Sequence, residues 1–391
     1  MDLSHILNHL GEDREQYFGA VSPPVMQTSN FAFPNLDAFR QAFTSEYDHH
    51  LYTRGNNPTV AILRQKVAAL EGTEDALICS SGSGAVAAAV ISQVNAGDHV
   101  VCVESPYSWT KILLRDFLPR FGVTTTFVDG SDTDQIEAAL RDNTKVLYLE
   151  SPNSLTFGIQ DLRACADLAR PRGITTIIDN SYASPLFQRP AELGIDLVVH
   201  SGTKYLNGHS DVVVGVICGS RAKLEGIFER EYMTLGPIIS PHDASLVIRG
   251  LRTLELRMQR SDASARWIAE QLKAHPQVEE VLHPLLPSFS QYELASRQMS
   301  GAGGLFSARF RTDSMEKMEA FCNTLVGPDG GFTLAVSWGG HESLALPTLT
   351  FYHIPGREDS PLPWTLVRFY IGLEDPQWLW ERLERAMALL G

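Results

Sequence analysis

The stretch ALICSSGSGAVAAAV, residues 76–90, passes from a short apolar run through a glycine turn into an alanine-rich segment. This order predicts a strand, a tight turn and a helix, and the first backbone N–H groups of such a helix have no partner within it. Because a helix N-terminus favours a bound anion, we expect a phosphate at this turn.

Two other interpretations of the turn stay open at this point. Gly82, Gly84 and Ala87 also satisfy the dinucleotide fingerprint G-x-G-x-x-A. Glu104 ends the next apolar run about 20 residues on, where a ribose-binding acid would stand. Taken alone, the stretch therefore favours a nicotinamide enzyme, or a turn whose glycines only allow close packing of helix on strand.

Seven short apolar runs alternate with helical patterns between about residue 59 and residue 219. They are ALICS (76–80), HVVCVE (99–104), VTTTFV (123–128), KVLYLE (145–150), ITTIID (174–179), DLVVHS (196–201) and VVVGVICG (212–219). The alternation predicts an α/β fold with one large, mostly parallel, seven-stranded sheet wrapped by helices. Pro58 and Gly72 are suited to open and close the first of these helices.

The remaining chain predicts an arm before this domain and a smaller domain after it. Residues 1–50 have little periodicity and three prolines, so we expect an extended arm that contacts a neighbouring subunit. The large domain is predicted over 51–245, and a long helix through 245–275, mildly broken at Gly250, leads into a small C-terminal α+β domain over 246–391. That domain has strand candidates at 303–310, 333–338 and 367–372 and helix candidates at 315–325 and 377–390.

Composition excludes several classes of protein. The formal net charge of −14 and the absence of a Lys/Arg run argue against nucleic acid and anionic membrane as partners. The chain shows neither the basic start of an export signal nor about 20 consecutive apolar residues, so a cytoplasmic enzyme is expected. Its five scattered cysteines predict reduced core thiols, and no Cys/His spacing indicates a metal.

A second group of polar residues follows two apolar runs, in ITTIIDNSYASP (174–185) and DLVVHSGTKYLNGHSD (196–211). Ligands of open parallel sheets bind at the carboxyl ends of the strands, so Asp179 and Lys204 are expected near the phosphate turn. An aspartate there can pair with a protonated pyridine nitrogen, and a lysine can condense with an aldehyde, as pyridoxal phosphate requires. Ser201 and Thr203 would add hydroxyl groups to the phosphate. Alternatively, Asp179 could be a helix cap after a strand, and Lys204 could be a solvated loop lysine.

These motifs together resemble the cystathionine synthase and lyase family of pyridoxal phosphate enzymes of cysteine and methionine metabolism. The resemblance covers nearly the whole chain. It is carried by YTRGNNPT (52–59), SSGSGA (80–85), ESPNS (150–154), IIDNSYASP (177–185), HSGTKYLNGHSD (200–211), RGLRTL (249–254), SWGGHESL (337–344) and VRFYIGLED (367–375). It implies the aspartate-aminotransferase-like fold, fold type I, and a homotetramer whose active sites are shared between subunits.

The resemblance also implies roles for individual residues at the cofactor. Lys204 would bind the cofactor and carry the proton at the substrate's α-carbon, and Asp179 would keep the ring nitrogen protonated. Tyr107 would stack on the ring and assist proton movement. The backbone of Gly82 and Ser83 would bind the phosphate together with Ser201 and Thr203, and Tyr52 and Arg54 would reach it from the neighbouring subunit.

For the substrate, the resemblance implies that Arg368 binds the α-carboxylate with Ser337 beside it, as suits a bidentate guanidinium. A structural salt bridge would explain Arg368 equally well in isolation. The chain departs from most relatives at ESPNS, where Asn153 directly follows the proline and Ser154 stands in the usual place of asparagine. Ser154, and Trp338 after the serine of SWGGHES, resemble bacterial cystathionine β-lyases.

We therefore expect β-elimination of cystathionine, or of a cysteine-type sulfur amino acid, to a thiol, pyruvate and ammonia. Against this branch, LYTRGNNPT resembles the γ-synthase and γ-lyase members, and Trp109 matches no branch. γ-Elimination or γ-replacement, as in cystathionine γ-lyase, cystathionine γ-synthase or methionine γ-lyase, is the first alternative. A nicotinamide dehydrogenase and a non-catalytic regulatory protein are the others.

Overall fold

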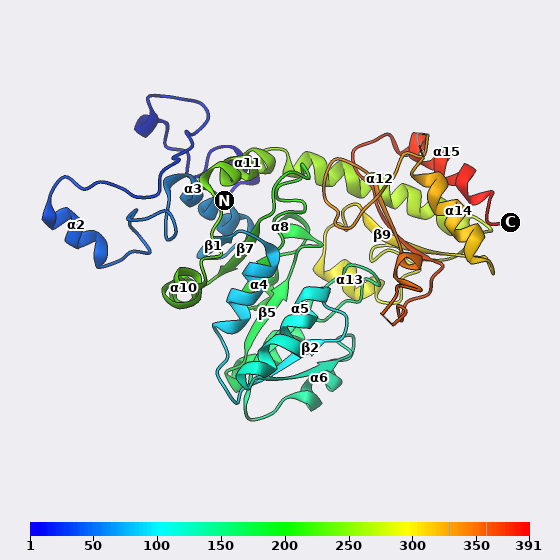
Figure 1. Ribbon diagram of the computed structural model, residues 1–391, viewed down its shortest axis with the longest axis horizontal. Coiled ribbons are helices and arrows are strands. Elements are labelled where there is room, and N and C mark those ends of the chain that lie inside the picture. The colour runs from blue at the N-terminus through cyan, green and yellow to red at the C-terminus, as the bar shows by residue number, and fades with distance from the viewer. Residues whose placement is uncertain (328, 357) are drawn as a thin grey trace. The chain divides into compact units, whose positions relative to one another are not determined.

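The computed structural model describes residues 1–327, 329–356 and 358–391, which form two compact units (Figure 1). The first unit comprises residues 1–151, 160–207 and 211–253, and the second comprises 152–159, 208–210 and 254–391. The main division thus falls at Thr253/Leu254, eight residues after the boundary predicted at 245/246. None of the helices in the described ranges is long and apolar enough to cross a membrane.

The first unit is built on a seven-stranded sheet in the order β1-β7-β6-β5-β4-β2-β3. Its strands are β1 (Asp75–Cys79), β2 (His99–Val103), β3 (Thr124–Val128), β4 (Thr144–Glu150), β5 (Thr175–Asp179), β6 (Leu197–His200) and β7 (Gly215–Gly219). β7 runs antiparallel to both of its neighbours, and the other pairs are parallel. The predicted mostly parallel sheet of seven strands is confirmed.

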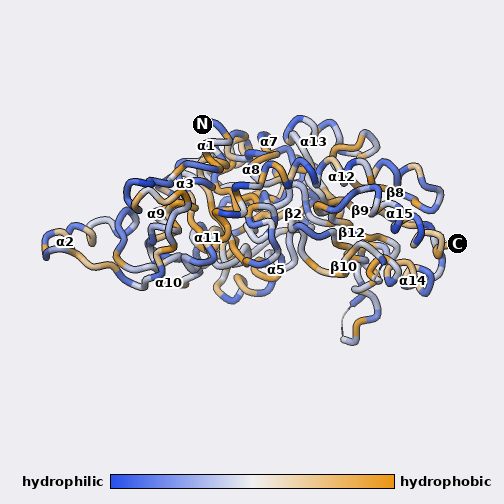
Figure 2. The backbone as a smooth tube through the Cα atoms, turned by 90° about the horizontal axis from the view of Figure 1, so that it is seen from above, coloured by the Kyte–Doolittle hydropathy of each residue, from blue (hydrophilic) through white to orange (hydrophobic). Residues whose placement is uncertain are grey.

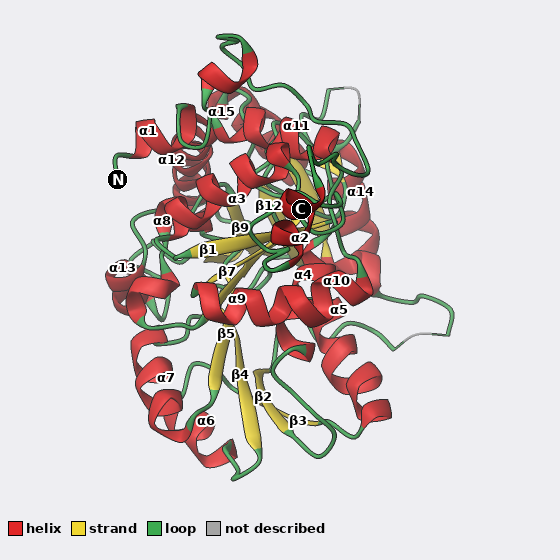
Figure 3. Cartoon of the chain, turned by 90° about the vertical axis from the view of Figure 1, so that its left-hand side faces the viewer, coloured by secondary structure: helices red, strands yellow, loops and turns green. Residues whose placement is uncertain are grey.

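The helices of this unit lie over the sheet and along the N-terminal segment, and Figure 3 shows α6 and α7 beside strands β4 and β5. They are α1 (Leu3–Asn8), α2 (Leu36–Phe43), α3 (Pro58–Glu71), α4 (Gly82–Ile91), α5 (Ser108–Ile112), α6 (Thr133–Ala139), α7 (Leu162–Ala169), α8 (Ser184–Phe187), α9 (Arg221–Ile227), α10 (Met233–Leu235) and α11 (Pro241–Leu251). As predicted, Pro58 occupies the first turn of α3, and Gly72 ends it at φ +76°.

The N-terminal segment is less extended than predicted, because it contains α1 and α2. Asp2 and Asn35 cap these helices with side-chain oxygens that accept from the backbone N–H groups of His5 and Ala38. α2 protrudes from the first unit and mixes hydrophilic with hydrophobic residues (Figures 1 and 2). Its Leu36, Phe39 and Phe43 are 59%, 41% and 64% exposed.

The second unit contains a five-stranded sheet in the order β10-β11-β12-β9-β8, with only β10 and β11 parallel. Its elements are α12 (Leu254–Ala274), β8 (Val278–Leu282), α13 (Tyr292–Gln298), β9 (Leu305–Phe310), α14 (Met315–Leu325), β10 (Thr333–Leu334), β11 (Leu344–Pro347), β12 (Leu366–Tyr370) and α15 (Pro376–Met387). α12, α14 and α15 pack their apolar side chains on the sheet, so this unit has a core of its own.

The long helix predicted through 245–275 is wrong in one respect, because the chain forms two helices, α11 and α12. The break lies at residues 252–253, two residues after Gly250. There the backbone N–H and the hydroxyl of Thr253 both donate to the Gly250 carbonyl oxygen, at 3.2 Å each. Such local side-chain bonds compete with the helical pattern.

Candidate functional site

Polar residues of the first unit gather where β4, β5 and β6 end. Glu150 at the end of β4 pairs with Asp179 at the end of β5, and Asp179 pairs with Val199 near the end of β6. The three strands are parallel and end at similar heights, so the residues that follow them share one edge of the sheet. This is the edge at which the sequence predicts a ligand.

The phosphate turn forms the N-terminus of α4. The Ser81 hydroxyl oxygen accepts from the Gly84 N–H at 3.0 Å, and the Ser81 carbonyl accepts from the Ala85 N–H at 3.0 Å. Within the described part of the chain, the N–H groups of Gly82 and Ser83 donate to no protein atom. α4 therefore presents two unpaired donors at its positive end, the arrangement that binds a phosphate.

Glycine at position 82 is required by the approach of this turn to β6. A Cβ at residue 82 would lie 2.9 Å from the Ser201 Cβ and 3.0 Å from the Ser201 Cα. Such contacts are too short for any side chain. The structure thus brings Gly82 and Ser201, predicted from separate motifs, into direct contact.

Asp179 is joined to the same place by Ser181. The N–H and hydroxyl of Ser181 donate to one Asp179 carboxylate oxygen at 2.9 and 2.5 Å, and the Ser201 N–H donates to the Ser181 hydroxyl oxygen at 2.6 Å. The chain Asp179–Ser181–Ser201–Gly82 therefore links the predicted ring-nitrogen acid to the phosphate turn. Ser181 was not among the predicted site residues, although it lies in the quoted motif IIDNSYASP.

Thr203 and Lys204 follow Ser201 in a turn. The Thr203 hydroxyl donates to the Val214 carbonyl at 3.1 Å and accepts from the Val214 N–H at 2.9 Å. Donation to a phosphate would require this hydroxyl to rotate, because its proton already has an acceptor. Lys204 is half-buried, and its backbone N–H donates to the Ser201 carbonyl at 3.1 Å.

Tyr107 is positioned by a buried carboxylate that sequence reasoning did not single out. The Tyr107 backbone N–H donates to a Glu150 carboxylate oxygen at 2.6 Å, just before α5 begins. Glu150 is 6% exposed, whereas the Tyr107 side chain is 42% exposed and can stack on a ligand. Glu150 opens the motif ESPNS, which is the only signal that the sequence offers for it.

Tyr52 and Arg54 lie on an exposed turn of the first unit, with the guanidinium carbon 5.4 Å from the tyrosine ring centroid. This distance allows a cation–π contact between the two side chains. They line a cavity of about 350 Å³ together with residues 27–29, 53 and 238–241.

Arg368, Ser337, Trp338 and Ser154 all belong to the second unit. The Arg368 guanidinium donates to the Ser154 carbonyl at 3.2 Å and to the Ser337 carbonyl at 3.0 Å. Arg368 is 7% exposed, and burial lowers its pKa from 12.5 to about 10. Among the described residues no carboxylate lies within ion-pair distance of it, so the structural salt bridge is not found.

The two loops that hold Arg368 have special conformations. Ser337 has a φ of +77°, which is uncommon outside glycine and places its carbonyl on the guanidinium. In the other loop, the Asn153 side-chain oxygen accepts from the N–H groups of residues 155, 156 and 157 at 2.9–3.1 Å. Asn153 thereby fixes the loop that carries the Ser154 carbonyl, a role that its sequence position did not reveal.

Three comparisons with known proteins identify the family and the fold of this chain. The model of the family described as Cys/Met metabolism PLP-dependent enzyme matches residues 5–388. L-methionine gamma-lyase from Pseudomonas deceptionensis is 40% identical over 389 residues, which cover 97% of this chain and 95% of the relative. Cystathionine gamma-lyase from Mus musculus is 37% identical over 385 residues, which cover 97% of this chain and 93% of the relative.

Among solved structures, the crystal structure of metB from Corynebacterium glutamicum matches with a TM-score of 0.90 and 35% identity. The match covers 100% of this chain and 99% of the other, and it confirms the predicted fold. The matching family is described as PLP-dependent, so the cofactor is pyridoxal phosphate and not a nicotinamide dinucleotide. The chain belongs to the family of pyridoxal-phosphate-dependent enzymes of cysteine and methionine metabolism.

Proposed function

We propose that this protein is a carbon–sulfur lyase that removes a thiol, with ammonia, from a sulfur amino acid. The observation that carries the proposal is the hydrogen-bonded chain from Asp179 through Ser181 to Ser201, which Gly82 contacts. It would set an acid for a ring nitrogen and a cradle for a phosphate at one edge of the sheet.

 
Lys204 follows Ser201 in the same turn, so adjacent strand ends support the acid, the phosphate cradle and the amine.

The described residues fit the family's cofactor. The unpaired N–H groups of Gly82 and Ser83 can bind its phosphate, and the second carboxylate oxygen of Asp179 is left for the ring nitrogen, because Ser181 bonds only the first. Lys204 would bind the aldehyde carbon. When bound, pyridoxal phosphate supplies an electron sink for a carbanion at the substrate's α-carbon.

The protein's own side chains would then move and hold the protons. Asp179 would keep a proton on the ring nitrogen, and the Lys204 amine would remove the α-proton of the substrate. Tyr107, whose backbone Glu150 holds in place, would stack on the ring and assist proton movement to the departing sulfur. Ser201, and Thr203 after rotation of its hydroxyl, would support the phosphate, and the exposed pair Tyr52 and Arg54 would complete that site in a neighbouring subunit.

Arg368 would bind the substrate's α-carboxylate in the second unit. Its guanidinium is buried, charged and without a carboxylate partner in the described ranges, so an incoming carboxylate would supply the missing charge. The carbonyl groups of Ser154 and Ser337 orient the guanidinium, and Trp338, which is 7% exposed, lies next to Ser337.

We propose β-elimination as the reaction, which converts cystathionine and water to homocysteine, pyruvate and ammonia. The proposal rests on Ser154 in place of the usual asparagine and on Trp338, both of which resemble β-lyases. γ-Elimination is the second candidate, because relatives named L-methionine gamma-lyase are 40% and 39% identical to this chain. It would also require removal of a proton from the β-carbon and would give 2-oxobutanoate.

Product analysis separates the two reactions. The purified protein, loaded with pyridoxal phosphate, is given cystathionine, and the 2-oxo acids are identified by chromatography, with Lys204→Ala as the control. We expect pyruvate from the unmodified protein and no 2-oxo acid from the control. Release of 2-oxobutanoate alone would move the protein to γ-elimination, and no product from any sulfur amino acid would contradict the lyase proposal.

A further inference from the structure

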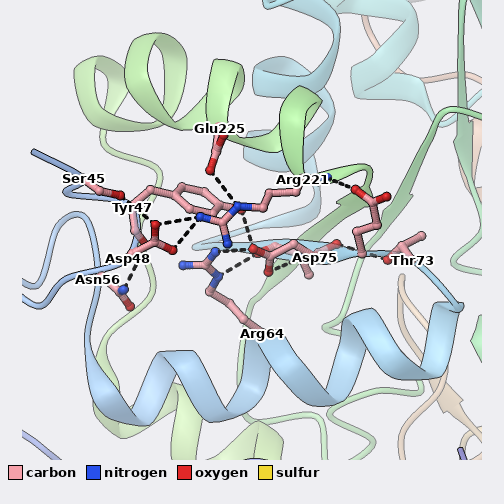
Figure 4. Close-up of polar contacts among 11 residues, drawn as sticks. Ser45, Tyr47, Asp48, Asn56, Arg64, Thr73, Asp75, Arg221 and Glu225 are labelled. Atoms are coloured by element: carbon pink, nitrogen blue, oxygen red, sulfur yellow. Dashed lines mark hydrogen bonds and ion pairs between the residues drawn. The ribbon is translucent and has the colours of Figure 1, made fainter.

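Five side chains around Tyr47 form a cluster that we call the Tyr47 anchor: Tyr47, Asp48, Arg64, Asp75 and Arg221 (Figure 4). They come from the segment before Tyr52, from α3, from β1 and from the start of α9. The anchor therefore ties one loop of the first unit to three regular elements. The reaction proposed above makes no use of it.

Tyr47 is held at its ring by two guanidinium groups and at its hydroxyl by a carboxylate. The guanidinium carbons of Arg64 and Arg221 lie 4.5 and 5.1 Å from its ring centroid, within the range of cation–π contacts. Its hydroxyl donates to the Asp75 carboxylate at 2.6 Å, and Arg64 donates to the same oxygen at 2.8 Å. Only 6% of the Tyr47 surface is exposed, so the side chain is buried together with these contacts.

Asp48 adds a second attachment beside the first. Its two carboxylate oxygens accept from one Arg221 nitrogen at 2.6 and 2.7 Å, and Ser45 donates to one of them at 2.7 Å. Arg221 also bonds Glu225 on the next turn of α9, at 2.8 Å. The guanidinium that covers the Tyr47 ring is thus itself held from two sides.

The anchor is bonded to the turn that carries Tyr52 and Arg54. The Asn56 side-chain amide donates to the Tyr47 carbonyl at 3.2 Å, and the N–H groups of Gly55 and Asn56 donate to the Tyr52 carbonyl at 2.9 and 3.2 Å. Gly55 and Asn56 are buried, whereas Tyr52 and Arg54 are exposed. The turn therefore has a fixed base and an exposed Tyr–Arg pair.

We infer that Tyr47 is a positioning residue that fixes this turn so that Tyr52 and Arg54 can bind a phosphate held by another copy of the chain. The inference rests on the proposed function, in which this pair serves the neighbouring subunit. A preformed turn avoids the free-energy cost of ordering its backbone when the phosphate binds. Without the anchor, we expect cofactor affinity in the neighbouring subunit to fall about tenfold.

Mixed oligomers test this inference. One chain carries Lys204→Ala and the other carries Arg54→Ala, with different affinity tags so that only mixed assemblies are purified. In such an assembly, each complete site combines Lys204 of the Arg54→Ala chain with Arg54 of the Lys204→Ala chain. Cofactor bound at this site is measured by borohydride trapping on Lys204 and intact mass over a range of pyridoxal phosphate concentrations.

Tyr47→Leu is then added to one chain at a time. On the Lys204→Ala chain, which presents the working turn, we expect about tenfold weaker cofactor binding and a matching loss of activity at limiting cofactor. On the Arg54→Ala chain, whose turn serves a site without Lys204, we expect no change. Asp48→Asn, a milder change at the partly exposed end of the anchor, should give the same asymmetry with a smaller loss of about threefold.

The outcomes distinguish the inference from the proposal on which it rests. Equal losses on both chains, or no loss on either, would overturn the positioning role of Tyr47 while leaving the shared site intact. A parent mixed oligomer in which Lys204 traps no cofactor and no product forms would overturn the shared site itself, and the inference with it. If Tyr47→Leu chains do not assemble, Asp48→Asn tests the inference instead. A loss of cofactor binding only on the Lys204→Ala chain would support it, and equal losses or no loss would overturn it.

Discussion

Replacing Arg368 by lysine tests the carboxylate site, because the structure predicts a pH dependence that the original protein lacks. Burial lowers the pKa of Arg368 from 12.5 to about 10, which corresponds to about 3 kcal/mol against the charged form. The same burial would lower the pKa of a lysine at this position from about 10.4 to about 8. The lysine would therefore lose its charge between about pH 8 and pH 10, where the arginine is still charged.

The direction and size of the change in kcat/KM follow from the charge of the lysine. At pH 7 the lysine is protonated, but it cannot make the bidentate contact, so kcat/KM should fall about 10- to 100-fold. Above about pH 8 the lysine becomes neutral, and kcat/KM relative to the original protein should fall a further tenfold for each pH unit. Most of the loss should lie in KM, because binding of the carboxylate is what weakens.

The assay is the rate of 2-oxo acid release between pH 7 and 9.5, expressed as the ratio of variant to original protein so that other titrating groups cancel. Arg309→Lys, on the neighbouring strand β9, is the matched control, since Arg309 is partly exposed and paired with Glu279 and Glu280. A constant ratio across this pH range, or an equal effect in the control, would refute the assigned role of Arg368.

Three further changes have expected outcomes. Asn153→Ala should raise KM about tenfold by releasing the loop that orients Arg368, whereas Asn153→Asp, which keeps the acceptor oxygen, should have a smaller effect; steady-state kinetics measures both. Gly82→Ala should weaken pyridoxal phosphate binding at least tenfold in a spectrophotometric titration, and Gly226→Ala, where a Cβ meets open space, should not. Lys66→Met should lower the free energy of unfolding by about 3–5 kcal/mol in urea titrations, because it leaves the buried Glu12 carboxylate without this partner at 3.1 Å.

The large sheet could be predicted from the sequence because each strand is a short apolar run between turn residues. All seven runs became strands, with bounds shifted by three residues at most. The small domain was less predictable. Of the run at 333–338 only Thr333–Leu334 forms a strand, and the positive φ of Ser337 lies in the remainder. β8 was missed because it carries two exposed glutamates in succession, and β11 because it has four residues and ends in proline.

Some residues of the candidate site could likewise be predicted from the sequence, and others could not. Gly82, Asp179, Ser201, Lys204 and Arg368 could be named in advance because family motifs carry them. The residues that hold them in place depend on contacts between distant segments, such as the bond from Tyr107 to Glu150, 43 residues apart in sequence. Hydrogen bonds of this kind leave no periodic pattern, so sequence analysis could not identify Glu150 or Ser181 as positioning groups.

The most direct test of the account is whether Lys204 moves the proton at the α-carbon. The loaded protein is incubated in D₂O with an amino acid that cannot eliminate, such as L-alanine, and loss of the α-proton signal is followed by NMR. We predict exchange by the original protein and a rate at least 100-fold lower for Lys204→Ala, as expected when a positioned general base is removed. Exchange at an unchanged rate in Lys204→Ala would contradict the assignment of Lys204 as the catalytic base.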